Sequence, residues 1–265
     1  MLTFRDFISG IRKLEIDRSL PVVAHASLAA FGEVHGGAET VLGALLSSFN
    51  TIIMPAFTYR TMIIPELGPP ENAMIYGSGK DTNRMAEIYR PDMPSDPMMG
   101  VVAEALRSHP KAQRSNHPIL SFTGINAAKI LESQTLKEPF LPIQGIRDAA
   151  GWVLLMGVDQ TVNTSIHYAE LLAGRIQFVR WALTPTGIIP CPGFPGCSDG
   201  FDAVTPQIAD IIRRVELGEA VIQAMPMVNL VDAVGAMLKE NPTALLCARE
   251  DCERCNTVRA SVTFL

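Results

Sequence analysis

Hydrophobic side chains in the first part of the chain switch between helical spacing and short buried runs. Residues 3–14 and 37–49 carry apolar side chains three and four positions apart, which predicts two amphipathic helices, the first capped by Thr3. The runs at 21–25 and 51–55 are apolar and include Val or Ile, as expected of buried strands. This order predicts two parallel strands joined by a right-handed crossover.

Pro, Gly and Asn then interrupt the pattern from residue 65 to residue 96, which predicts a long loop. Loops of this length in a compact domain usually serve a site, so we expect a substrate-facing lid, with disorder as the alternative. Helical spacing resumes at 100–108 and 126–132, and residues 151–158 form an apolar run typical of a buried strand.

The C-terminal third is less regular. Residues 186–202 are dense in Gly and Pro and are interpreted as turns of a linker, whereas 202–218 and 229–241 have helical spacing around an apolar run at 220–227. The whole pattern predicts an α/β protein, a three-layer α/β/α fold with a central mixed, largely parallel sheet. We expect one domain over 1–265, with a C-terminal portion from about residue 186 that is rich in Gly, Pro and Cys.

The amino-acid composition limits the kinds of binding partner that we expect. Hydrophobic residues make up 48% and charged residues 18% of the 265 positions, which suits an enzyme with buried strands. No apolar run approaches a membrane span, and the charged N-terminus is unlike a signal peptide, so we expect a cytoplasmic protein without a membrane partner. A net charge of −5 without a basic cluster disfavours nucleic acid. A homodimer is left open.

Five cysteines occur, an odd number that disfavours a disulfide framework. Cys252 and Cys255 form a C-x-x-C motif, and Cys191, Cys197 and Cys247 would complete the ligand number of a zinc site. A second C-x-x-C pair is missing, so free thiols are the preferred interpretation and a structural zinc is the alternative.

The most informative segment is Asn163–Glu170, which follows the apolar run at 151–158. A helix from Ser165 would place His167 and Glu170 on one face, where the carboxylate can fix the imidazole tautomer. Histidine titrates near neutral pH and is suited to removing a proton from an ammonium group. An isolated H-x-x-E pair is more often a half-buried His beside a solvated Glu, but its place after a strand, where α/β sheets bind ligands, favours a catalytic pair.

Four motifs together resemble the antibiotic N-acetyltransferase family, whose best-known members are the aminoglycoside 3-N-acetyltransferases. The likeness runs from about residue 20 to about residue 205. Its motifs are H-x-S-L-x-x-x-G at 25–32, G-G-A at 36–38, R-S-x-H-P at 114–118 and N-T-S-x-H-x-A-E at 163–170.

This resemblance implies acetyl-coenzyme A as co-substrate and a small-molecule amine as acceptor. His167 would be the general base and Glu170 its partner, in a direct transfer that needs no metal and no cysteine nucleophile. The residues expected to bind the coenzyme are Ser27, Leu28, Arg114, Ser115, His117 and Thr164. Asp96, at the end of the long loop, is expected to bind the cationic acceptor.

The sequence departs from the family pattern in two places, which leaves the acceptor open. Residues 140–145 lack an expected Ser-Pro pair, and the Cys-rich tail from Cys247 is unlike the better-known members. An aminoglycoside acetylated at its 3-N position is the preferred acceptor, and another amine is the alternative. Two rivals from other classes are a zinc-dependent hydrolase using His25, His117 and His167, whose spacing lacks a zinc signature, and a non-catalytic coenzyme-binding module.

Overall fold

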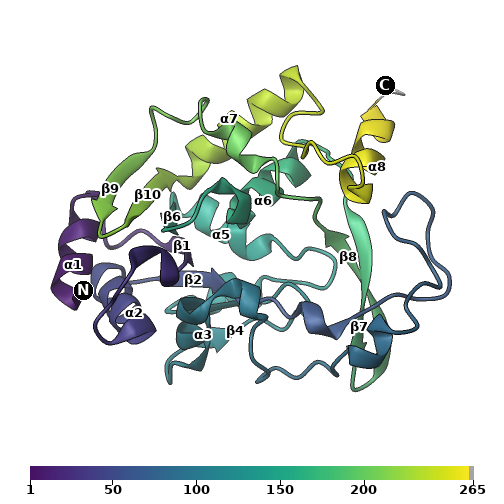
Figure 1. The fold of residues 1–265 in the computed structure, drawn as a ribbon, viewed down its shortest axis with the longest axis horizontal. Coiled ribbons are helices and arrows are strands. Elements are labelled where there is room, and N and C mark those ends of the chain that lie inside the picture. Colours follow the sequence, from purple (N-terminus) through teal and green to yellow (C-terminus); the bar gives the residue numbers. More distant parts are fainter. Residues whose placement is uncertain (263–265) are drawn as a thin grey trace.

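The computed structural model describes residues 1–262, and its centre is a seven-stranded sheet of order β4-β5-β2-β1-β6-β10-β9 (Figure 1). The strands of this sheet are short and mostly buried where they cross the core. They are β1 (Val22–Ala26), β2 (Ile52–Pro55), β4 (Gln113–Arg114), β5 (Phe122–Ile125), β6 (Trp152–Met156), β9 (Arg213–Leu217) and β10 (Ala220–Pro226).

Helices cover both faces of this sheet, which confirms the predicted α/β fold. Alternate residues of one strand point to opposite faces, so Val22 belongs to one core and Val23 to the other. The Val22 face is covered by α1 (Phe4–Arg12), α2 (Gly37–Ser48) and α3 (Val101–Ser108). The Val23 face is covered by α4 (Ala128–Glu132), α5 (Leu141–Asp148), α6 (Thr164–Leu172) and α7 (Met227–Glu240).

The sheet is mixed, as predicted, but it is less parallel than expected. β1 is parallel to β2 and to β6, and the predicted crossover from β1 through α2 to β2 is present. The outer pairs β2·β5, β4·β5, β6·β10 and β9·β10 are all antiparallel. For β9 and β10 the reason is local, because a tight hairpin joins them and such a connection joins only antiparallel strands.

A second sheet has the order β3-β7-β8 and contains β3 (Met62–Ile63), β7 (Phe178–Thr184) and β8 (Gly187–Phe194). The prediction of an irregular linker at 186–202 is therefore wrong for its first half, because residues 187–194 pair with β7. The helix predicted at 202–218 is also wrong, since this segment forms a short 3₁₀ turn (Phe201–Val204) and then β9.

The loop at 65–96 is irregular, as predicted, with one 3₁₀ turn at Thr82–Met85. It packs on the small sheet: the amide of Asn72 accepts from the backbone N–H of Val179 at 2.7 Å and donates to its carbonyl at 3.0 Å. The last element is α8 (Glu253–Val262), which lies at the upper right of Figure 1, near the end of the small sheet. No helix within residues 1–262 combines the length and apolar content needed to cross a membrane.

Candidate active site

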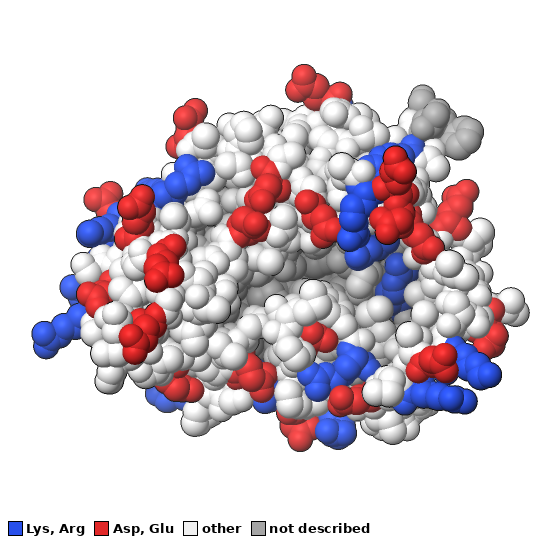
Figure 2. Space-filling model, in the orientation of Figure 1, with Lys and Arg blue, Asp and Glu red and all other residues white. Residues whose placement is uncertain are grey.

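A cleft of about 590 Å³ opens at the carboxyl ends of β1, β2 and β6. The sheet grows from β1 to β2 on one side and to β6 on the other, so the cleft lies at a topological switch point, where open α/β sheets bind ligands. Figure 2 shows the hollow near the centre of the molecule, with uncharged side chains inside it, acidic groups along its upper rim and basic groups toward its right end.

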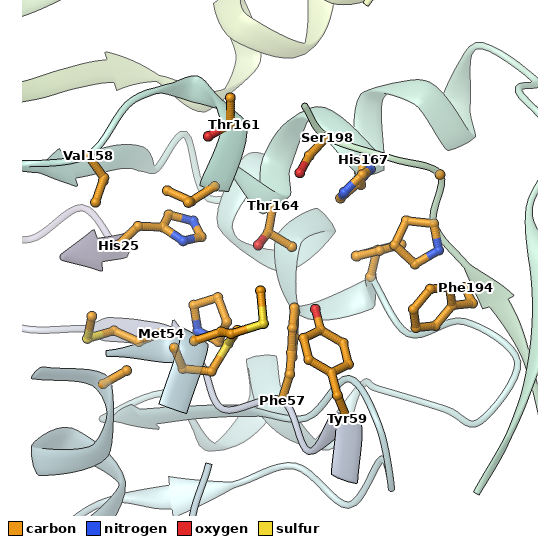
Figure 3. A pocket seen from close by; sticks show the side chains of 18 of the residues that line it. His25, Met54, Phe57, Tyr59, Val158, Thr161, Thr164, His167, Phe194 and Ser198 are labelled. Atoms are coloured by element: carbon orange, nitrogen blue, oxygen red, sulfur yellow. The ribbon is translucent and has the colours of Figure 1, made fainter. Parts of the chain in front are cut away.

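The walls of the cleft are largely apolar. The β1–β2 side contributes Met54 and Phe57, and the turn at Pro97–Met99 adds Met98 and Met99. Phe140 and Phe194 close the opposite side. Among the described residues, the charged side chains that line the cleft are Arg180, Asp199 and Arg254, and the polar ones that face into it in Figure 3 are His25, Tyr59, Thr161, Thr164, His167 and Ser198.

His167 and Glu170 form the contact that their helical spacing allows. His167 Nδ1 lies 2.9 Å from Glu170 Oε2, and Glu170 Oε1 accepts from Arg175 Nη1 at 2.5 Å. Arg175 Nη2 donates to the carbonyls of Pro242 and Ala244, each at 2.7 Å. The three side chains therefore form one chain of hydrogen bonds that runs from the cleft to the segment after α7.

The hydrogen bonds from Arg175 through Glu170 determine the tautomer of His167. A carboxylate already bonded to a buried arginine can only accept from Nδ1, so the proton of a neutral imidazole lies on Nδ1 and the lone pair on Nε2. Phe140 stacks on the imidazole with ring centres 6.3 Å apart, and Phe201 meets it edge-on at 4.7 Å. The ring is thus fixed on several sides, and His167 lines the cleft.

The start of α6 is built to hold this geometry. Asn163 caps the helix, with its side-chain oxygen accepting from the Ser165 N–H at 3.1 Å, and its amide donates to Gln160 Oε1 at 2.9 Å. Thr164 follows at the first helical position, is 5% exposed and lines the cleft. The position of Thr164 allows the predicted contact with the coenzyme, which stays a prediction.

Two arginines at the cleft were not predicted from the sequence. Arg180 on β7 lies over the rings of Phe178 and Phe194, and burial lowers its guanidinium pKa to about 10, so it stays charged near neutral pH. Arg254 on α8 donates to the Gly196 carbonyl at 2.9 Å. Arg180 lies in no motif, and Arg254 lies in a C-x-x-C motif that points to a metal and not to an organic ligand, so only the fold reveals that the two arginines share one cleft.

His25 and Tyr59 line the cleft in uncharged form. Burial lowers the pKa of His25 to about 4, which leaves the imidazole neutral at physiological pH. Burial likewise raises the pKa of the Tyr59 hydroxyl well above its ordinary value. Both side chains can therefore offer hydrogen bonds to a bound molecule without adding a charge.

The structure places Arg114, Ser115 and His117 outside the cleft. Arg114 donates to Ser121 Oγ at 3.0 Å and to the carbonyls of Met93 and Ala56 at 2.5 and 2.6 Å. Its guanidinium thus joins the long loop to the sheet, which favours a structural role over the predicted phosphate contact.

Ser115 and His117 are likewise engaged with backbone. The Ser115 hydroxyl accepts from the Phe122 N–H at 2.8 Å, and His117 Nδ1 accepts from the N–H groups of Ile119 and Leu120 at 3.1 and 2.9 Å. Burial lowers the pKa of His117 to about 4. These contacts shape the turn before β5, and they differ from the predicted coenzyme contacts.

The remaining predicted residues adjoin the cleft without lining it. Ser27 and Leu28 follow His25 and Ala26, which do line it, and the Ser27 N–H donates to the Met156 carbonyl at 3.0 Å. Asp96 caps the turn that carries Met98 by accepting from its N–H at 3.1 Å. No described residue from 65 to 96 lines the cleft, so the segment packs beside it rather than over it as the predicted lid.

The alternative of a zinc-dependent hydrolase requires three histidines that converge on one metal ion, and the structure does not bring them together. His25, His117 and His167 form no group that could hold a metal, and within residues 1–262 the cluster that could is made of four cysteines. Catalytic zinc needs three protein ligands converging on one ion. The geometry of the cleft therefore favours acid–base chemistry at His167.

Comparison with known proteins identifies the family. The sequence profile of a family described as aminoglycoside 3-N-acetyltransferase matches residues 23–239. The chain belongs to the aminoglycoside 3-N-acetyltransferase family, as the four motifs indicated. The members named below are acyltransferases, so the predicted enzyme class is confirmed.

Two curated relatives show the extent of the match. The aminoglycoside N(3)-acetyltransferase III of a Salmonella species is 30% identical over 251 residues, which cover 82% of this chain and 83% of that protein. A prophage-derived aminoglycoside N(3')-acetyltransferase-like protein of Bacillus subtilis is 30% identical over 184 residues. That match covers 63% of this chain and 64% of the relative, so it spans slightly less than two thirds of the relative's length.

Solved structures share the fold over nearly the whole chain. Aminoglycoside acetyltransferase AAC(3)-IVa without ligand superposes with a TM-score of 0.80 at 21% identity, covering 98% of both chains. A mutant of that enzyme in complex with a gentamicin gives a TM-score of 0.78 at 20% identity and covers 98% and 97%. AAC-IIIb in its binary complex with CoASH gives 0.72 at 19% identity and covers 90% and 96%.

Proposed function

We propose that this chain transfers an acetyl group from acetyl-coenzyme A to an amine of an aminoglycoside, at the 3-N position, with His167 as general base. The observation that carries the proposal is the hydrogen-bonded chain of His167, Glu170 and Arg175, which leaves one basic ring nitrogen facing a cleft. Family membership supports the donor and the reaction type.

In this mechanism, His167 Nε2 accepts a proton from the substrate ammonium group, and the freed amine attacks the thioester carbonyl. A C–N bond forms and the C–S bond breaks. The acylated nitrogen loses its second proton as the amide forms, and the departing thiolate of the coenzyme takes up that proton. Glu170 stabilises the imidazolium that forms on His167. Because Arg175 holds Glu170 on its other oxygen, Glu170 and Arg175 are positioning residues rather than proton carriers.

The apolar and basic parts of the cleft suit the two ends of the donor. Met54, Phe57 and Phe194 offer a hydrophobic wall for the pantetheine arm. Arg180 and Arg254 bring two positive charges to the same cleft, which supports a contact with coenzyme phosphates. Thr164, at the first position of α6, lies beside His167 and can hydrogen-bond the arm near the thioester.

One observation at the cleft favours the alternative acceptor, an amine other than an aminoglycoside. Among the described residues that line the cleft, Asp199 is the only carboxylate, whereas a polycationic sugar is best bound by several. Asp159 adds a second carboxylate nearby, since it accepts from the N–H of the lining residue Thr161 at 3.0 Å. Asp202 accepts from the adjacent Gln160 N–H at 2.9 Å.

A thiol-release assay with acetyl-coenzyme A, run across aminoglycosides and simple amines, tests both parts of the proposal. We expect His167→Ala to lower turnover about 10²–10⁴-fold while coenzyme binding changes little, as for loss of a general base. His35→Ala, at an exposed histidine outside the cleft, is the control.

Three outcomes contradict parts of the proposal. Turnover of His167→Ala within threefold of wild type removes the general-base role. Thiol release with simple amines but with no aminoglycoside supports the alternative acceptor. Coenzyme binding without turnover of any acceptor indicates a non-catalytic binding module.

A further inference from the structure

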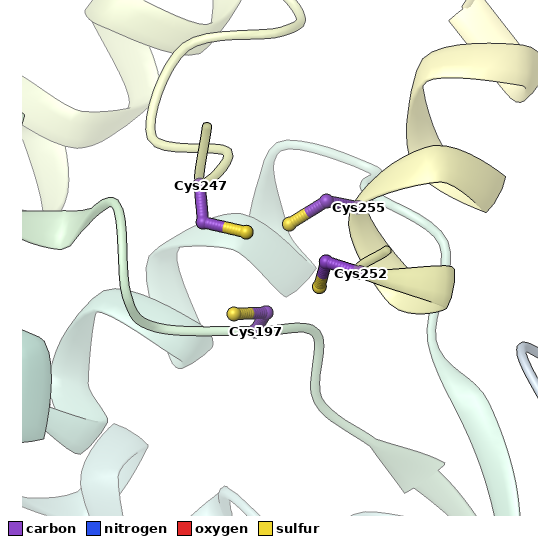
Figure 4. Close-up of side chains that lie close together, drawn as sticks. All are labelled: Cys197, Cys247, Cys252 and Cys255. Atoms are coloured by element: carbon purple, nitrogen blue, oxygen red, sulfur yellow. The ribbon is translucent and has the colours of Figure 1, made fainter. Parts of the chain in front are cut away.

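Four of the five cysteines converge on one point, although they come from distant parts of the sequence. The Sγ atoms of Cys197, Cys247, Cys252 and Cys255 all lie within 4.8 Å of one another. Figure 4 shows the four side chains gathered around one place, with Cys197 from the segment after β8, Cys247 from the loop after α7, Cys252 from just before α8 and Cys255 from the first turn of α8. The cysteines are free thiols, not disulfides.

This arrangement has the dimensions of a four-cysteine zinc site. Zn–S bonds of about 2.3 Å in a tetrahedron separate the sulfur atoms by about 3.8 Å, so a small contraction of the observed cluster would enclose one ion. The Asp199 N–H lies 3.5 Å from Cys197 Sγ, in the orientation of a donor to a metal-bound thiolate. Four sulfur ligands leave no open position, which is typical of a structural and not a catalytic site.

Hydrophobic packing involves too few residues of α8 to explain what holds this helix in place. Of its ten residues, only Cys255 and Val258 are buried. The four cysteines form a small cluster of their own, with Leu246 packed between it and the core on the Val23 face, and Val258 is the one buried residue of α8 that belongs to that core. A set of side chains this small buries little apolar surface, and such segments are commonly held by a metal.

The surrounding charges fit an ion with four thiolates, which carries a net charge of −2. Arg249, Arg254 and Arg259 all lie in the segment that supplies three of the cysteines. Arg259 donates to the Cys247 carbonyl, and Arg249 pairs with Asp199 at 3.2 Å. These cations can offset the negative charge of the cluster.

We propose that Cys197, Cys247, Cys252 and Cys255 bind one structural Zn²⁺ that fixes the C-terminal wall of the cleft. Gly196 and Ser198 flank Cys197 and line the cleft, and Arg254 lies between Cys252 and Cys255 and lines it too. The ion would thus tie α8 to the segment after β8. The metal site stands on its own geometry, and only its effect on catalysis rests on the proposed function.

Metal content tests the site without reference to activity. Protein purified under reducing conditions, or reconstituted with Zn²⁺ and desalted, is expected to contain one zinc per chain by elemental analysis. A mercurial reagent that caps thiols should release that zinc to a chromogenic chelator. Co²⁺ substitution should give the visible bands of a tetrahedral ion together with thiolate charge-transfer absorption.

Two variants separate the cluster from ordinary buried thiols. The double variant Cys252→Ser/Cys255→Ser is expected to retain less than a tenth of the zinc, whereas Cys191→Ser, at a buried cysteine outside the cluster, should retain all of it. Wild-type protein stripped by a chelator should lose thermal stability and regain it with Zn²⁺ but not with Mg²⁺. This measurement on wild type keeps the test valid if the double variant fails to fold.

Several results would overturn the inference. Wild-type protein that binds no zinc after reduction and reconstitution contradicts it, as does an unchanged zinc content in the double variant. Iron in place of zinc under all conditions would refute the identity of the ion. If zinc binds and its removal leaves the Michaelis constants of an active enzyme unchanged, the link between the ion and the cleft wall is wrong. An enzyme without acetyltransferase activity that still binds one zinc would refute only the proposed function.

Discussion

Replacing Glu170 by Gln is the sharpest test of the hydrogen-bonded chain, because it changes one atom and leaves the shape intact. The Gln oxygen would stay toward Arg175, a buried cation whose side chain is 4% exposed, and the NH₂ group would then face His167 Nδ1. An NH₂ group only donates, so Nδ1 must become the acceptor and the ring proton must move to Nε2. His167 Nε2 would then carry the proton and could not act as a base toward the cleft.

The expected loss is about 10³–10⁴-fold in kcat, or about 4–5.5 kcal/mol of transition-state stabilisation. Stability should fall too, because Arg175 loses a buried carboxylate partner. Breaking such a pair costs about 3–5 kcal/mol, and the remaining amide oxygen favours the lower end. A loss of about 3 kcal/mol corresponds to a decrease of about 6–12 °C in Tm for a chain of this size.

The assay is thiol release at a temperature well below the Tm of the variant, with thermal unfolding measured on the same sample. Glu240→Gln, at an exposed carboxylate at the end of α7, is the matched control. If folded Glu170→Gln keeps kcat within tenfold of wild type, the tautomer argument is refuted. A large loss of Tm with an unchanged kcat would assign Glu170 to stability alone.

Three further outcomes follow from the geometry. Arg114→Ala should lower Tm, since the Arg114 guanidinium donates to three backbone carbonyls and to Ser121. The Michaelis constant for acetyl-coenzyme A should stay within about twofold of wild type. If the variant instead loses more affinity for coenzyme A than for dephospho-coenzyme A, the predicted phosphate contact of Arg114 is supported. Asp199→Asn should raise the Michaelis constant for a polycationic aminoglycoside about 3–10-fold and flatten its salt dependence, and identical kinetics at low and high salt would place the acceptor elsewhere. Burial lowers the pKa of His25 and His117 to about 4, so the unfolded chain binds more protons than the folded one between pH ~6.5 and ~4; the free energy of unfolding should fall as the pH falls through this window, and urea titrations of His25→Gln should show a shallower fall than wild type.

Local sequence patterns predicted the elements that carry the candidate general base. The helix at Thr164–Leu172 has its cap and its His–Glu spacing within one short segment, so the contact at 2.9 Å follows from helical geometry alone. The same holds for β1, α2 and β2, where burial and periodicity agree.

The missed strands had conflicting local signals. β8 contains Pro190, Pro192 and Gly193, which suggested turns, but it is an edge strand, where proline is tolerated because one side needs no partner. The helix predicted at 202–218 overlaps β9, and the pairing of β9 with β10 overrides the helical spacing of that segment.

The rest of the site depends on contacts between distant segments. Arg180 and Arg254 reach the cleft from the small sheet and the last helix, and no local pattern marks either arginine as a cleft residue. Arg114 was part of a family motif, but a motif does not distinguish a ligand contact from a guanidinium that binds backbone carbonyls. Cys191 and Cys197 were both candidate ligands by sequence, and only the fold shows that Cys197 joins the cluster and Cys191 does not.

The central place of β1 has a consequence for how the chain folds. β1 pairs with β2 after one intervening helix, whereas its other neighbour, β6, begins at Trp152, beyond the midpoint of the chain. During synthesis, one side of β1 must therefore wait for a partner until most of the first 156 residues have emerged. Pairing over such sequence distances is slow because a long loop must close before any contact offsets its entropy. The cleft floor, made where β1, β2 and β6 end, should be among the last parts of the molecule to form.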